Sequence, residues 1–347
     1  MTLSQTAVLV KQIITISILA LVLGIAGFIG YKIWYAYYLS TLPPQEEKPD
    51  TKFGPLPNPS FPKGTVSSSN FSYTIDTFNG NLPQIGQDKG FDKIIKVYFV
   101  IKTLATFLSP EKSQNLAGKF DIKSQPQILS ETNYLFKEAD KSLNVDLDTG
   151  NFVYRNGLTP PEQTGLDDDN KLVSDFQRTL ENLGVLSEDI KKGRSKIFPL
   201  KNNAGQLTPT DVRAEANAAQ ISLWPTPIDN KPILTSQYNV SIISANVYKS
   251  ALNINNYLLL NYKYFPIDTS TYATYPLKSS DEALADLKNG KGAVVIEPVK
   301  PQVSITSIYL GYFLPENYSP YLQPIYVFEG PHFVAYVPAI NEQFISQ

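Results

Sequence analysis

The sequence contains no cysteine and a single histidine, His332, among 347 residues. Without cysteine the chain forms no disulfide, no zinc–thiolate site and no cysteine nucleophile. One histidine excludes metal sites built on a histidine pair and leaves one imidazole as a candidate general base. Because an animal extracellular domain of this size usually carries disulfides, the absence of cysteine favours a bacterial cell envelope.

Strong charge is also missing. The 30 basic and 32 acidic residues give a net charge of −2, and the basic residues form no long run. A chain with this charge balance has no strong positive electrostatic field to attract nucleic acid, so we expect no nucleic-acid partner. The sequence also lacks a glycine-rich phosphate loop and a dinucleotide fingerprint, so we expect no cofactor.

One long apolar run is present near the N-terminus. Residues 13–30 carry no charge, and as a helix they span about 27 Å, close to the thickness of a bilayer's hydrocarbon core. The run is too long for the apolar part of a signal peptide and continues into aromatic residues suited to the membrane interface. The sequence therefore predicts a short cytoplasmic tail (1–11), an uncleaved transmembrane anchor (12–38) in the lipid bilayer, and a C-terminal region outside the cell.

Four small residues recur along the anchor at spacings of three and four. They are Ser17, Ala20, Gly24 and Gly27. This spacing places them on one helix face, where small side chains allow a second helix to approach closely. We interpret them as a candidate helix–helix interface; the alternative is that small residues are simply common in membrane helices.

Proline and serine dominate residues 39–69, with seven prolines between Pro43 and Pro62. Proline at this density neither continues a helix nor pairs in a central strand. The composition predicts a semi-rigid extended linker, with a proline-rich ligand for another domain as the alternative. Two domains, 70–165 and 166–347, are expected to follow.

Hydrophobic periodicity in this region predicts alternating helices and antiparallel strands. Helices are expected at 92–108, 172–186, 210–220 and 279–289. Strands are expected at 71–78, between 127 and 155, at 233–248 and 254–267, and as a four-stranded meander from 293 to 338. Asp148–Asn151 is expected to form a hairpin turn. The fold class is therefore α+β, with helices packed on one sheet face.

Three groups of polar residues are candidates for a metal site or a catalytic site. The Asn144-x-Asp146-x-Asp148 run lacks the glycine and the glutamate that a calcium loop requires at its sixth and twelfth positions. The acidic run 167–169 is better suited to capping the N-terminus of the next helix than to binding a cation. Glu297 and Glu329, expected on adjacent strands, are the candidate pair for glycoside hydrolysis. We expect neither a catalytic nor a metal site.

Residues 144–156 (NVDLDTGNFVYRN) resemble the closing hairpin of PepSY-type domains, and residues 280–339 are similar to the last domain of Yyc-type accessory regulators. The resemblance implies two helix-plus-antiparallel-sheet units of PepSY or cystatin type. It also implies a non-catalytic external domain that acts on a sensor kinase.

These observations together predict a bacterial, membrane-anchored, extracytoplasmic binding or regulatory protein. Its partner is expected to be another envelope or membrane protein, such as a sensor kinase or a protease, bound at a sheet edge or in a groove. The alternatives are a cell-wall glycan-acting enzyme that uses Glu297 and Glu329, and a structural or pilus-associated envelope subunit.

Overall fold

The computed structural model describes residues 3–41, 48–84, 90–159, 165–203 and 206–346. The chain divides into two compact units, residues 1–48 and 49–347. Parts of the expected tail, linker and domain boundary (residues 1–2, 42–47 and 160–164) lie outside the described residues. We refer to residues 49–347 as the head.

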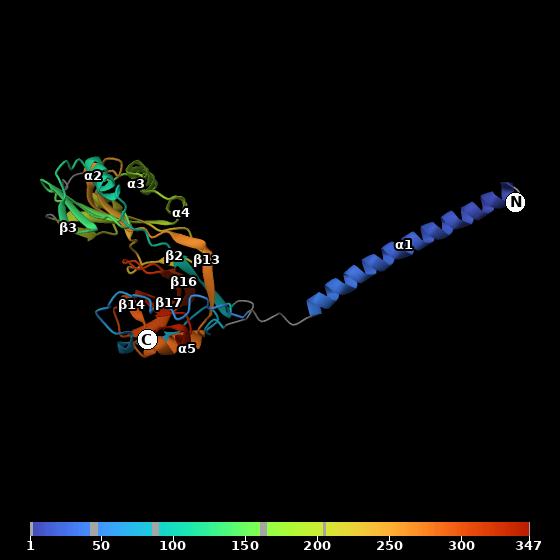
Figure 1. Cartoon of the computed structure of the whole chain (residues 1–347). Helices are drawn as coiled ribbons and strands as arrows, with labels where there is room; N and C mark the ends of the chain where they lie inside the picture. Colours follow the sequence, from blue (N-terminus) through green and yellow to red (C-terminus); the bar gives the residue numbers. More distant parts are fainter. Residues whose placement is uncertain (1–2, 42–47, 85–89, 160–164, 204–205, 347) are drawn as a thin grey trace. The chain divides into compact units, whose positions relative to one another are not determined.

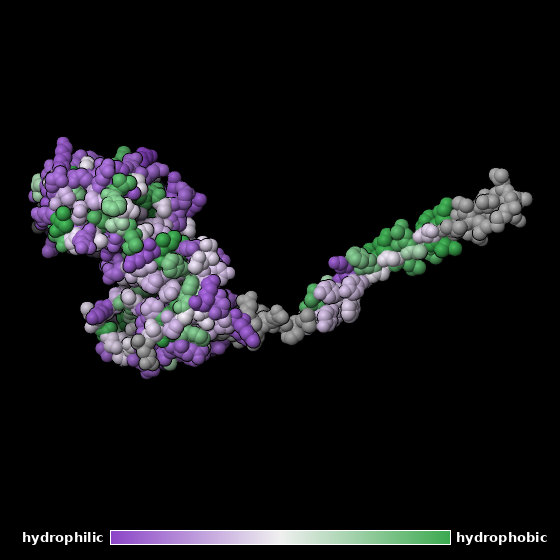
Figure 2. Space-filling view, in the orientation of Figure 1, coloured by the Kyte–Doolittle hydropathy of each residue, from purple (hydrophilic) through white to green (hydrophobic). Residues whose placement is uncertain are grey.

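The first unit contains one helix, α1 (Leu3–Thr41). Within it, Ile14–Leu39 is apolar enough to cross a membrane, and its 26 residues rise about 39 Å. All side chains described along this stretch are exposed, and Figure 2 shows the apolar surface along the helix. The prediction of one N-terminal helix of membrane-spanning length is confirmed. The orientation of the chain in the membrane stays a prediction.

The head contains a nine-stranded sheet in which every neighbouring pair is antiparallel (Figure 1). In spatial order its strands are β3 (Gln127–Ser130), β4 (Asn133–Glu138), β5 (Lys141–Asp146), β6 (Phe152–Asn156), β12 (Tyr257–Tyr262), β11 (Ile243–Tyr248), β9 (Ala218–Leu223), β7 (Ser195–Asn203) and β8 (Gln206–Pro209). The predicted turn between β5 and β6 is confirmed. Gly150 adopts φ +72° there, and its N–H donates to the Asp146 carbonyl at 2.8 Å.

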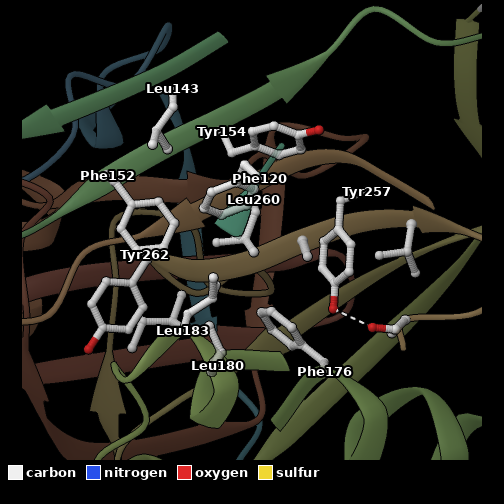
Figure 3. Packing of buried hydrophobic residues seen from close by; sticks show 14 of the residues in the cluster. Phe120, Leu143, Phe152, Tyr154, Phe176, Leu180, Leu183, Tyr257, Leu260 and Tyr262 are labelled. Atoms are coloured by element: carbon white, nitrogen blue, oxygen red, sulfur yellow. Dashed lines mark hydrogen bonds between the residues drawn. The ribbon is translucent and has the colours of Figure 1, made fainter. Parts of the chain in front are cut away.

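Two helices cover one face of this sheet. They are α2 (Ser109–Lys119) and α3 (Asp169–Leu183), and their apolar side chains pack into one core with the strands (Figure 3). Aromatic rings fill much of it: Phe120 stacks on Tyr154 with ring centroids 4.4 Å apart, and Phe152 stacks on Tyr262 at 5.3 Å. Since successive side chains of a strand alternate between faces, the polar residues of β5 and β6 lie on the opposite face.

The acidic run before α3 has the predicted role. The side chain of Asp168 accepts a hydrogen bond from the Lys171 backbone N–H at 2.9 Å, which caps the helix. Gly184, in the left-handed region at φ +78°, ends it. The helix expected at 172–186 is therefore confirmed, but it begins and ends three residues earlier than expected. A one-turn helix, α4 (Glu188–Lys191), follows.

A seven-stranded sheet forms the rest of the core. Its strands are β10 (Ile233–Leu234), β16 (Ser307–Phe313), β17 (Tyr321–Gly330), β18 (Phe333–Pro338) and β14 (Ala293–Ile296) in that order, with β2 (Ile94–Val100) on β17 and β13 (Ile267–Pro276) on β2. Helix α5 (Ser280–Lys288) packs on β18. Its predicted capping box between Ser279 and Glu282 is confirmed. A parallel pair, β1 (Ser72–Ile75) and β15 (Gln302–Ile305), completes the strands, and 3-10 turns lie at 68–70, 213–215, 254–256 and 342–344.

The helix expected at 92–108 is wrong. Residues 94–100 form strand β2, which pairs with β13 on one side and with β17 on the other. Four of these seven residues are β-branched, a composition that suits a pleated sheet better than a helix. Ser109 and Pro110 then begin α2 rather than ending a helix, with proline in the first turn, where its missing N–H costs nothing.

The helix expected at 210–220 is also wrong. Residues 213–215 form a 3-10 turn, and β9 begins at Ala218. Ala218 and Ala219 are fully buried between β7 and β11. Small side chains here reflect close packing inside the sheet rather than helix propensity.

The strands do not separate into two helix-plus-sheet units. Strands β6 and β12, which lie on opposite sides of residue 165, pair within the nine-stranded sheet. The predicted four-stranded meander is confirmed for β16, β17 and β18. β14 pairs with β18 at the far end of this order rather than with β16, and β15 pairs with β1 in a separate sheet. The strand expected at 71–78 covers only 72–75. The mixed α+β class stands, with larger sheets than expected.

Residues 49–69 differ from the expected spacer because they pack on the head. Leu56 is fully buried (0% exposed), and its backbone bonds to Phe344 and Ser346. Phe53 stacks on Tyr321 at 4.9 Å. The Gln323 side-chain amide donates to the Pro57 carbonyl at 2.7 Å. Proline supplies the extended backbone, and the buried side chains between the prolines fix it to the sheet.

We expect Leu56→Ala to lower the free energy of unfolding of the head by about 2–4 kcal/mol, because it leaves a cavity in a closed core. Urea unfolding of the chain in lipid nanodiscs, followed by the circular dichroism of the sheets, measures this change. Leu158→Ala, at an exposed position, is the control and should shift the free energy by under about 0.5 kcal/mol. Equal effects of the two variants would show that residues 49–69 act as a free spacer.

Candidate protein-binding groove

Residues 101–108, which connect β2 to α2, expose large apolar side chains. We call this segment the apolar loop. Leu104 is 66% exposed and Phe107 is fully exposed at 103%, while Ile101 and Leu108 are also exposed. Single exposed apolar residues are normal on a protein surface, but a contiguous group is typical of an interaction site.

Hydrogen bonds along its length hold the apolar loop in place, beginning with the Ile101 N–H, which donates to the Pro266 carbonyl at 2.8 Å. The Ala105 N–H donates to Oδ1 of Asp148 at 2.8 Å, and the Thr106 N–H donates to the Ser109 hydroxyl at 3.0 Å. Asp148 belongs to the turn between β5 and β6. The loop is therefore fixed to one end of the nine-stranded sheet, and its side chains still point into solvent.

A cavity of about 570 Å³ lies beside the apolar loop. It is bounded by that loop, α2, the β5–β6 turn and the residues that follow α3. Its apolar lining comes from Leu104, Leu116, Val145, Leu147, Leu183 and Val185. This volume lies within the range of ~300–1,000 Å³ that is common for ligand pockets.

A second cavity of about 670 Å³ adjoins the first. Both are lined by Lys119 and Leu183. The Lys119 ammonium donates to the Asn182 and Leu183 carbonyls at 2.9 and 3.0 Å and so caps the C-terminus of α3. The same side chain lies between the two cavities, since it lines both. Leu252 and Ile254 line the far end. We call the two cavities together the binding groove.

The binding groove suits an extended or helical peptide segment with several apolar side chains. Apolar side chains line both of its cavities, and polar side chains between them, together with the ammonium groups of Lys112 and Lys119, can bond to the backbone of such a segment. A segment laid along the groove would remove the apolar loop from water, which is the main favourable term in such associations.

The free sheet edge at β3 is a weaker candidate. Among the described strands, β3 pairs with β4 alone, and its Ile128 and Leu129 are exposed. The pairing register shifts between Ile128 and Ser130, which places a bulge at Leu129. A bulge twists an edge strand and hinders the addition of another strand.

The small residues of the anchor lie on one face of α1, as their spacing predicts. Ser17, Ala20, Gly24 and Gly27 are all exposed, and a Cβ atom built on either glycine would meet nothing within 4 Å. Their role as a helix–helix interface stays a prediction.

The two candidate carboxylates do not lie on adjacent strands, so this expectation is wrong. Ile296, which precedes Glu297, and Glu329 both pair with Val334, so β18 separates the strands that carry them. Oε1 of Glu329 accepts hydrogen bonds from the hydroxyls of Tyr309, at 2.9 Å, and of Tyr238. Burial and, secondly, the bond to this carboxylate raise the pKa of Tyr238. The Thr65 hydroxyl donates to Glu297.

The remaining polar candidates build turns. His332 lies exposed in the turn between β17 and β18, as expected, with φ +55°. Asp146 accepts the Asp148 N–H at 2.9 Å, and Asp148 accepts the Ala105 N–H. Within the described ranges, no group of three acidic or histidine side chains is placed to hold a metal ion.

Sequence reasoning missed the groove because it assigned the apolar loop to the buried face of a helix. Ile101, Leu104 and Leu108 follow helical spacing. The available contrary signal was Pro110, which favours the start of a helix at Ser109, together with the β-branched run before Ile101.

No family model and no curated protein matches the chain. Among solved structures, an uncharacterized protein from Eubacterium rectale is similar with a TM-score of 0.35 and 10% identity, over 76% of this chain and 87% of that one. The C-terminal domain of YpeB from Bacillus megaterium is similar with a TM-score of 0.28 and 10% identity, over 70% of this chain and 95% of that one. At these TM-scores neither similarity carries an argument about function.

We expect Asp148→Ala to release the apolar loop, because it removes the acceptor of the Ala105 N–H. Amide hydrogen exchange of residues 101–108 should accelerate by about tenfold, corresponding to the loss of ~1.4 kcal/mol from a charge-assisted hydrogen bond. Asp140→Ala, in the turn between β4 and β5, is the control and should leave this exchange unchanged. Unchanged exchange in both variants would mean that Asp148 does not position the loop.

Proposed function

We propose that this protein is a non-catalytic, membrane-anchored binding protein of the bacterial envelope. Its head captures an apolar segment of another envelope or membrane protein in the binding groove. The observation that carries the proposal is the exposure of Leu104 and Phe107 in a loop that borders a groove of mixed lining, in which apolar side chains alternate with polar ones. The helix of membrane-spanning length supports attachment of the head to a membrane.

The physical basis is burial of apolar surface at about 25 cal/mol per Å². Side chains of the apolar loop that leave water on binding supply the favourable free energy, and the bonds through Asp148 and Ser109 lower the cost of ordering the loop. Anchoring in the same membrane as its partner also raises the effective concentration of each protein for the other.

A non-catalytic role agrees with the surroundings of the acidic residues. Glu329 is engaged by two tyrosine hydroxyls, and Glu297 by one threonine hydroxyl. These contacts build the face of the seven-stranded sheet around β18.

We expect a photo-crosslinking amino acid at position 104 to form a discrete crosslinked product with another protein in native membranes. The control is the same amino acid at Phe78, which is as exposed (104%) as Phe107 but belongs neither to the apolar loop nor to the lining of the groove. Adding Phe107→Ser should reduce the product from position 104 by about tenfold or more, as loss of a buried aromatic anchor predicts.

Two results would contradict the proposal. One is an identical set of products from positions 104 and 78, which indicates collision rather than binding. The other is that Phe107→Ser lowers the yield of the product from position 104 no more than the control substitution Phe78→Ser does.

A further inference from the structure

A separate cavity of about 200 Å³ lies on the polar side of the nine-stranded sheet. It is formed by β5 and β6, by residues 263–265 after β12, and by residues 316–318 in the connection between β16 and β17. Its volume is below the ~300 Å³ at which pockets for drug-sized ligands begin. The ligand it can hold is therefore a small one, about the size of a single ring.

Amide side chains form much of the lining. Asn144, Asn151 and Asn317 all line the cavity. Asn151 is almost fully buried, and its Oδ1 accepts the Tyr264 N–H at 2.8 Å, which leaves the amide donors available. Within the part of the chain that the structure describes, the side chains of Asn144 and Asn317 form no hydrogen bond. Each primary amide offers two donors and a carbonyl acceptor.

The charges of the lining largely cancel. The Lys263 ammonium lies 3.3 Å from Oε2 of Glu316 and neutralises it. Asp146 also lines the cavity, and one of its oxygens accepts the Asp148 N–H. The lining therefore has one net negative charge and many hydrogen-bonding groups.

Two aromatic residues close one side. The rings of Phe265 and Tyr318 pack edge to face with centroids 6.1 Å apart. The Tyr318 hydroxyl donates to the Val100 carbonyl at 3.1 Å, which fixes the ring in place. Burial raises the pKa of Tyr318 above its ordinary value.

We propose that this cavity binds one sugar ring. Sugar hydroxyls donate and accept hydrogen bonds equally well, so they match a lining of amides, a carboxylate and a paired lysine. The apolar face of a pyranose ring can lie against the half-buried Tyr318 ring, which the buried Phe265 ring supports from beside it. Asp146 and Thr149 line both this cavity and the binding groove, but the two sites share no apolar lining residue and require different ligands.

The same chemistry disfavours other small ligands. A strongly ionic ligand would have to separate Lys263 from Glu316 and lose their attraction. An apolar ligand would bury the Asn144 amide and the amide donors of Asn151 without partners, at the cost of their desolvation. A neutral ligand rich in hydroxyl groups avoids both costs.

The test is saturation-transfer-difference NMR of methyl glycosides of glucose and N-acetylglucosamine. The full chain is held in lipid nanodiscs, because detergents with sugar headgroups would compete for the site. We expect transfer from the protein to the ring protons of at least one glycoside. Asn144→Leu should weaken its binding by about tenfold, as loss of a hydrogen bond to a ligand predicts.

Two further variants keep the test decisive. Asn317→Ala, on the exposed β16–β17 connection, should also weaken binding without affecting the fold. Asn79→Leu, an exposed asparagine outside the cavity lining, should leave binding unchanged. No transfer to either glycoside, or transfer that survives unchanged in both Asn144→Leu and Asn317→Ala, would overturn the proposal.

Discussion

Burial of the apolar face of the nine-stranded sheet under α2 and α3 determines where both candidate sites lie. The two helices cover one face, and the spaces around their ends form the binding groove. The same alternation of side chains places Asn144 and Asp146 on the other face, where the small polar cavity opens. An amphipathic sheet therefore supplies an apolar site beside the helices and a polar one behind them. Asp146, at the end of β5, and Thr149, in the β5–β6 turn, line both regions.

The features that the sequence predicted correctly depend on local chemistry. The capping box of α5, the Asp168 cap of α3 and the glycine turn between β5 and β6 each follow from a few neighbouring residues. The apolar helix at the N-terminus follows from composition alone. The wrong helix predictions fall where strand pairing, rather than local sequence, determines the secondary structure. Residues 94–100 show helical as well as strand-like spacing, and only pairing on both sides with β13 and β17 makes them a strand.

The groove could not be predicted for the same reason. Its lining comes from segments between Thr103 and Val185 and from residues near Leu252, which only the sheet topology brings together. Local patterns also failed for residues 49–69, since proline content predicts an extended backbone correctly but does not reveal which side chains are buried. Leu56 and Phe53 find their partners near Phe344 and Tyr321, nearly three hundred residues away in sequence.

Attachment of residues 49–69 to the seven-stranded sheet also constrains the proposed binding role. The chain that leaves α1 becomes part of a folded sheet within a few residues of Pro49, so most of the expected spacer is unavailable as a flexible tether. Residues 49–69 therefore contribute to the stability of the head, and the proposed binding role does not require them as a flexible tether.

The most direct test of the central claim is hydroxyl-radical footprinting of Phe107 and Phe78 in native membranes and in the purified chain. Both rings are fully exposed in the isolated chain and should be oxidised at similar rates there. If a partner occupies the binding groove, oxidation of Phe107 in native membranes should fall several-fold while that of Phe78 stays unchanged. Equal oxidation of Phe107 in the two preparations would contradict the account.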